Sequence, residues 1–237
     1  KDVTLKKLTR VFRGKSDNIF FVYVAIQQAV EGIMYVIFFN QGHVLFAHSS
    51  LYIQESVYNV VIQKLKDRNE TLFLGDPLDK NTDIGAINSE KQLETIKNYI
   101  NIGLNEGGDI YQTKMNLPKK GNWCAPTLFL NVSQSHRIVQ EEIFGPVISV
   151  SKFKDEAEAL ELANQSEFGL GAGVWTRDMN KAFRMGRRIQ AGRVWTNCYH
   201  MYPAHAAFGG YKKSGVGRET HKMALEHYQQ TKNLLVS

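Results

Sequence analysis

The sequence predicts an α/β fold in which a mainly parallel sheet is covered by helices on both faces. Two observations carry this prediction. Short apolar stretches of strand length alternate along the chain with longer stretches whose apolar residues recur at helical spacing. The 237 residues contain no internal repeat, no low-complexity segment and no linker, and they suffice to bury one large core. We therefore expect a single domain.

The first half of the chain is expected to open with a buried strand and an amphipathic helix. The apolar residues of that helix recur every three or four positions: Val30, Ile33, Met34 and Ile37. Ser89 is a suitable N-cap for a later helix. The expected elements, in order, are a strand at 19–25, a helix at 27–39, a strand at 50–54, and helices at 56–69 and 88–105.

Strands and helices continue to alternate in the second half. Residues 146–153 (PVISVSKF) alternate between apolar and polar side chains, as a strand does. Asp155 can cap the helix that follows, and Gly192 ends a later, basic helix. The expected elements, in order, are strands at 127–132 and 146–153, a helix at 155–165, a strand at 171–176, a helix at 180–191, a strand at 193–197, a helix at 220–228 and a terminal strand at 233–236.

Composition and cysteine usage exclude several classes of protein. Apolar residues make up 43% of the chain and charged residues 22%, as in an ordinary soluble domain. The apolar run at 19–26 is far shorter than the roughly 20 residues that a membrane helix needs. Cys124 and Cys198 form neither a disulfide framework nor a zinc motif. We expect a cytoplasmic protein without a signal peptide or a metal site.

Five short motifs occur in an order that chance explains poorly. They read LGDP at 74–77, EEIFGPV at 141–147, FGL at 168–170, GRVWTN at 192–197 and FGGYKKSG at 208–215. In this order they resemble the motifs of the aldehyde dehydrogenase superfamily. The stretch from 171 to 237 is most similar to the bacterial acetaldehyde-type branch.

The resemblance implies a domain organisation and a reaction. Residues 1–230 resemble the catalytic domain, and residues 231–237 the start of the C-terminal oligomerisation strand, without the N-terminal half that carries the dinucleotide-binding sheet. The family oxidises an aldehyde to a carboxylate through a cysteine thiohemiacetal, with NAD or NADP as cofactor. This chain alone is not expected to bind the cofactor. Its expected partner is a second copy of the chain or a family-related subunit. Binding to a membrane or to a nucleic acid is not expected.

Two positions that the family uses for catalysis carry residues without the required chemistry. Residues 38–50 read FFNQGHVLFAHSS, and the family's nucleophile pattern G-Q-x-C, laid from Gly42, places its cysteine at Leu45. The general-base pattern E-L-G-G-K, laid on residues 11–15, places its glutamate at Val11. The two positions keep the family's spacing, so no local deletion explains the losses. We therefore predict that this chain is catalytically inactive, a truncated fragment or a pseudoenzyme.

Other site positions of the family keep suitable residues. By resemblance, Glu142 and Phe144 would hold the nicotinamide ribose and flank its ring, and Gln92 would lie near the adenosine ribose. Substrate-tunnel positions are occupied by Tyr202, Phe208 and Cys198. Each also has a purely structural interpretation: a capping carboxylate for Glu142, core aromatics, and a small buried hydrophobe for Cys198. We assign no role to Cys124.

Three other interpretations remain open. The net charge of +6 permits an anionic partner, with candidate basic residues at Arg184, Arg187, Arg188, Arg193, Lys212 and Lys213, but no nucleic-acid motif accompanies them. A fragment that complements a separate N-terminal half would bind without being active. A hydrolase pair at His48 and Ser49 lacks an orienting carboxylate. Residues 23–27 (YVAIQ) have also lost the acidic helix-capping residues usual in the family.

Overall fold

The computed structural model describes residues 16–47 and 49–237. Its strands form a seven-stranded sheet in the order β3-β4-β5-β2-β1-β7-β8. All neighbouring strands run parallel except the edge pair β3–β4. The strands are β1 (Asp17–Phe20), β2 (Ser50–Gln54), β3 (Asp109–Gln112), β4 (Thr127–Leu130), β5 (Val147–Phe153), β7 (Gly171–Trp175) and β8 (Arg193–Thr196).

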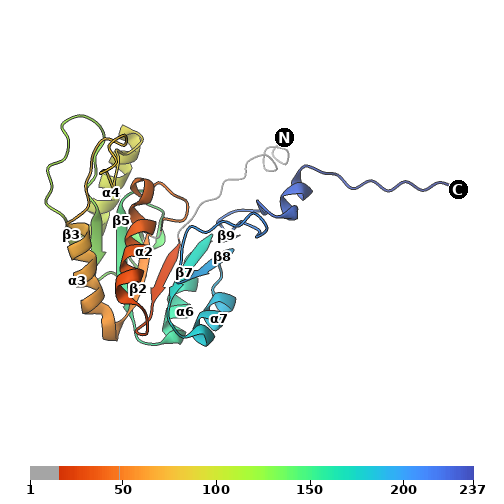
Figure 1. Ribbon diagram of the computed structural model, residues 1–237, viewed down its shortest axis with the longest axis horizontal. Helices are drawn as coiled ribbons and strands as arrows, with labels where there is room; N and C mark the ends of the chain where they lie inside the picture. The colour runs from red at the N-terminus through yellow and green to blue at the C-terminus, as the bar shows by residue number, and fades with distance from the viewer. Residues whose placement is uncertain (1–15, 48) are drawn as a thin grey trace.

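Helices cover both faces of this sheet, as the sequence predicts (Figure 1). On one face, α2 (Ile26–Phe38) and α3 (Tyr58–Asn69) pack on side chains such as Phe20 and Leu51. The other face is covered by α4 (Glu90–Asn105), α5 (Arg137–Gln140), α6 (Glu156–Asn164) and α7 (Met179–Arg188). Neighbouring residues Ile19 and Phe20 point into opposite clusters because side chains alternate along a strand.

Helix boundaries follow the capping chemistry. Ser89 accepts a hydrogen bond from the Gln92 N–H, and Asp155 accepts two from the first turn of α6. Asp178 caps α7, so that helix begins and ends slightly earlier than predicted. Helix α2 starts at Ala25 without a side-chain cap and has no acidic residue in its first turn. The capping carboxylates expected to be missing near residue 25 are therefore absent from this helix end.

The structure corrects several predicted elements. The first strand covers Asp17–Phe20 rather than 19–25, because the chain bends after Phe21. Strand β3 was not predicted: it is short and mostly exposed, and only its pairing with β4 makes it a strand. A short antiparallel ribbon joins β6 (Phe168–Gly169) to β9 (Tyr211–Lys212).

The C-terminal region differs most from the prediction. Instead of an α-helix at 220–228 there is a 3-10 turn, Lys222–His227, with no buried residue to hold a longer helix. Residues 229–237 carry no regular structure and leave the body as an extended tail (Figure 1). A strand at 233–236 needs a neighbouring strand for its hydrogen bonds. Its role in assembly stays a prediction. None of the described helices is long and apolar enough to span a membrane.

Candidate functional site

The loop between α2 and β2 keeps a strongly specified backbone. Asn40 and Gln41 have left-handed φ angles of 51° and 58°, and Gly42 follows at 74°. The Asn40 amide donates to the His43 carbonyl at 3.1 Å, and the Gln41 side-chain oxygen accepts from the Gly85 N–H at 3.2 Å. This turn therefore presents residues 43–47 at the amino end of the parallel sheet.

Leu45, at the predicted nucleophile position, lies in this loop as a partly buried apolar residue. It packs against a cluster of Phe46, Leu170 and Trp195. A leucine side chain has no lone pair with which to attack a carbonyl carbon. Val11, the predicted base position, and His48 lie outside the described residues.

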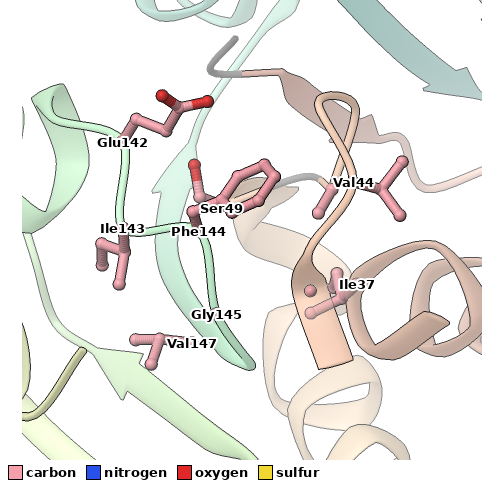
Figure 2. A pocket seen from close by; sticks show the side chains of 10 residues that line it. Ile37, Val44, Ser49, Glu142, Ile143, Phe144, Gly145 and Val147 are labelled. Atoms are coloured by element: carbon pink, nitrogen blue, oxygen red, sulfur yellow. The ribbon is translucent and has the colours of Figure 1, made fainter. Parts of the chain in front are cut away.

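A second loop, residues 141–145, faces the first. Glu142 and Phe144 line a small hollow together with Val44 and Ser49, and Figure 2 shows the Phe144 ring pointing across it toward the Val44 loop. Phe144 has a left-handed φ of 57°. The Gln92 side-chain N–H donates to the carbonyls of Ile143 and Phe144, at 3.1 Å each. In this chain Gln92 thus holds the loop that carries Phe144.

His43 lies against the same loop. Its ring stacks on Phe144 with centroids 5.5 Å apart and planes 8° from parallel. Burial lowers the pKa of His43 below its ordinary value. The hollow has a volume of about 10 Å³, enough for one water molecule, whereas a cavity of roughly 150 Å³ holds a benzene ring. The hollow between these two loops therefore has no room for an aromatic ring.

The structure brings the predicted tunnel residues together around Phe46, the residue that follows Leu45. Phe46 contacts Phe208 and Tyr202, with ring centroids 4.9 and 6.0 Å away. Cys198 packs against the edge of the same cluster. Burial raises the pKa of Tyr202, with Arg193 acting in the opposite direction.

The basic residues predicted as a possible binding face are mostly engaged within the chain. Arg184 binds the Glu156 carboxylate through two N–H groups at 2.8 and 2.7 Å. Lys213 pairs with Glu167 at 2.6 Å, and the Lys212 ammonium donates to main-chain carbonyls. The structure does not favour a shared basic patch.

Sequence reasoning missed the roles of His43 and Arg193. Arg193 lies among aromatic rings rather than on a basic surface. The alternation of β8 was the available signal, because it puts Arg193 and Trp195 on the same side of the strand. His43 had no local signal, since Phe144 lies about a hundred positions away. No group of three potential metal ligands occurs among residues 16–47 and 49–237.

Comparison with known proteins identifies the family. The model of the "Aldehyde dehydrogenase family" matches residues 1–234. An acetaldehyde dehydrogenase of Pseudomonas aeruginosa is 53% identical over 236 residues, which cover 94% of this chain and 46% of that protein. Aldehyde dehydrogenase B of Escherichia coli K12 is 53% identical over 235 residues, with the same coverage. The chain belongs to the aldehyde dehydrogenase family, and it spans about half the length of these curated relatives.

Solved structures agree with this assignment. Betaine aldehyde dehydrogenase from Staphylococcus aureus, in complex with NAD⁺, superposes with a TM-score of 0.89 at 37% identity, covering 92% of this chain and 44% of that one. An NAD-dependent aldehyde dehydrogenase from Sinorhizobium meliloti gives a TM-score of 0.90 at 36% identity, covering 94% and 44%.

Proposed function

We propose that this chain is a catalytically silent aldehyde dehydrogenase domain. The observation that carries the proposal is the leucine at position 45, the predicted nucleophile position, which packs against an apolar cluster. The family reaction requires a thiolate that attacks the aldehyde carbon and a carboxylate that activates water. The valine at the base position removes the second group independently.

The proposed cofactor of the ancestral reaction is NAD, because the solved neighbours are described as an NAD⁺ complex and as NAD-dependent. This chain alone is proposed not to bind it. The supporting observation is that the hollow lined by Glu142 and Phe144 has room for only about one water molecule. Titration calorimetry with NAD should give no saturable binding, and a saturable isotherm would overturn this part of the proposal.

The activity test follows NADH absorbance with NAD and acetaldehyde. We expect no rate above the buffer blank, and turnover by the purified chain contradicts the proposal. If turnover is observed, Cys198→Ala and Cys124→Ala test whether one of these two thiols supplies the nucleophile.

A chimera gives a sharper test. The N-terminal half of the Pseudomonas relative is joined to this chain, once unchanged and once with Leu45→Cys and Val11→Glu. We expect activity only in the repaired chimera. Activity of the unchanged chimera would refute catalytic silence. A folded, NAD-binding but inactive repaired chimera would show that the loss lies beyond these two positions.

The chain is also proposed to assemble with a second copy or with a family-related subunit. Its support is the terminal segment, where Leu234, Leu235 and Val236 are 77–87% exposed. Sedimentation at several concentrations should show self-association that Leu235→Asp weakens. A wild type that stays monomeric at all concentrations, alone and when mixed with a full-length relative, would contradict this proposal of assembly.

The two free thiols, neither of them in a disulfide, support the proposed cytoplasmic location.

A further inference from the structure

Arg193 is surrounded by aromatic rings. Its guanidinium carbon lies 5.8 Å from the ring centroid of Trp195 and 5.5 Å from those of Tyr202 and Phe208. The rings also contact one another, with centroids 5.9 Å apart for Trp195 and Tyr202 and 6.3 Å apart for Tyr202 and Phe208. We call these three rings the Arg193 cage.

The N–H groups of Arg193 are directed at main-chain carbonyls. They donate to Ala206 at 3.0 Å and to Met201 and Ala207 at 3.3 Å each. Among the described residues, Arg193 has no salt bridge to a carboxylate. Its charge is therefore stabilised by ring faces and carbonyl dipoles, the same chemistry that aromatic cages use to bind quaternary ammonium ligands.

The cage adjoins the emptied nucleophile loop. Phe46, which follows Leu45, contacts all three rings of the cage, with the closest centroid separation to Phe208. A ligand that reached Leu45 along these rings would therefore meet the guanidinium at short range. A cation would be repelled by Arg193 and would find these ring faces already occupied, whereas a neutral ligand would not meet the charge repulsion.

We propose that the Arg193 cage is a cation-binding site whose occupant is the chain's own guanidinium, and that Arg193 thereby closes this region to quaternary ammonium ligands. The inference concerns ligand selection and is independent of whether the chain catalyses any reaction. Burial lowers the pKa of Arg193, in keeping with a guanidinium that the rings partly shield from water.

The experiment empties the cage and offers a free cation. Arg193→Leu keeps an apolar stem but removes the guanidinium. Tetramethylammonium is titrated into the purified chain while tryptophan fluorescence and thermal unfolding are followed. We expect Arg193→Leu to bind it with an affinity roughly tenfold or more above that of the wild type, because three ring faces become available.

Arg218→Leu is the matched control. Arg218 also donates to main-chain carbonyls, those of Gly210 and Gly217, but it lies over a single ring, Tyr211, at 5.7 Å. This variant should gain no affinity. In Arg193→Leu combined with Trp195→Phe, the fluorescence response should fall, because Trp195 is a wall of the cage.

Three outcomes overturn the proposal: equal affinity in wild type and Arg193→Leu, a folded Arg193→Leu that does not bind, or an equal gain in Arg218→Leu. Should Arg193→Leu be unfolded by circular dichroism, free guanidinium at low, non-denaturing concentration is expected to restore its folded fraction. Absence of such rescue also overturns the proposal.

Discussion

Gly42 faces the main-chain carbonyl of Gly145 so closely that a β-carbon on Gly42 would lie 2.2 Å from the Gly145 oxygen. The contact joins the α2–β2 loop to the loop that carries Glu142 and Phe144, across about a hundred positions of sequence. Gly42 is therefore required for the packing of these two loops, whatever residue stands at position 45.

The contact predicts the cost of Gly42→Ala. The new methyl group would clash with the Gly145 carbonyl and be held at a φ of 74°. We expect a loss of about 2–4 kcal/mol in the free energy of unfolding, measured by urea denaturation. Gly107→Ala separates the two causes, since Gly107 has φ 88° but no described atom within 4 Å of the place its β-carbon would take. It should cost only about 1 kcal/mol.

A second control, at Gly186, involves neither a steric clash nor a positive φ angle. Gly186 lies within α7, and a β-carbon added there would meet no described atom within 4 Å outside the helix's own backbone. Gly186→Ala should therefore be neutral or stabilising by about 0.5–1 kcal/mol. If Gly42→Ala were no more destabilising than Gly107→Ala, the close approach to Gly145 would be refuted.

Asn18→Ala should destabilise the sheet centre. Asn18 is fully buried, and its side-chain oxygen accepts from the Trp175 indole N–H at 3.0 Å. Removing the acceptor leaves that N–H buried without a partner, at a cost of about 1–3 kcal/mol plus the lost packing. Thermal unfolding followed by tryptophan fluorescence measures the loss. Asn81→Ala, on an exposed turn, is the comparison and should stay within about 1 kcal/mol of the wild type.

Stability should fall as the pH drops below about 6.5. Burial lowers the pKa values of both His43 and His200 from the ordinary 6.5. Below that value the unfolded chain takes up protons that the folded chain does not, so the free energy of unfolding decreases until the folded-state pKa values are passed. Denaturant titrations between about pH 7.5 and pH 5.5 measure the slope.

Phenylalanine variants test whether His43 and His200 cause this pH dependence of stability. His43→Phe keeps a ring that can stack on Phe144, and His200→Phe keeps one beside Tyr35 and Phe39; each should reduce the slope. His205→Gln, at an exposed position, should leave it unchanged. A slope unaffected by both phenylalanine variants would show that other groups carry the dependence.

The two cysteines should differ in reactivity. Cys124 is buried, and burial raises its pKa to about 11, so only about one molecule in a thousand carries the thiolate at pH 8. Cys198 is only partly buried. We expect iodoacetamide to label Cys198 first, as read by peptide mass spectrometry, and both equally in denaturant. Faster labelling of Cys124 in the folded chain would contradict the burial of its thiol.

The main strands and helices could be predicted because each carries its own signal. Strand β5 alternates along its length, α2 repeats at helical spacing, and Ser89 and Asp155 cap helices through bonds to residues only two or three positions away. Strand β3 and the β6–β9 ribbon carry no such signal, since these stretches of two to four residues become strands only through a partner distant in sequence. The expected helix at 220–228 failed for the related reason that its apolar residues find nothing to pack against.

The sequence by itself determined the family, through ordered motifs, and it predicted the loss of catalysis, because a leucine or a valine lacks a reactive group in any environment. Only the tertiary structure decided what the remaining residues do. It placed Gly42 on Gly145, His43 on Phe144, and Arg193 among three rings. The first two contacts join residues about a hundred positions apart, and the rings around Arg193 are brought together by a loop without regular structure. Local spacing does not record such contacts, because they form when separate loops meet at one end of the sheet.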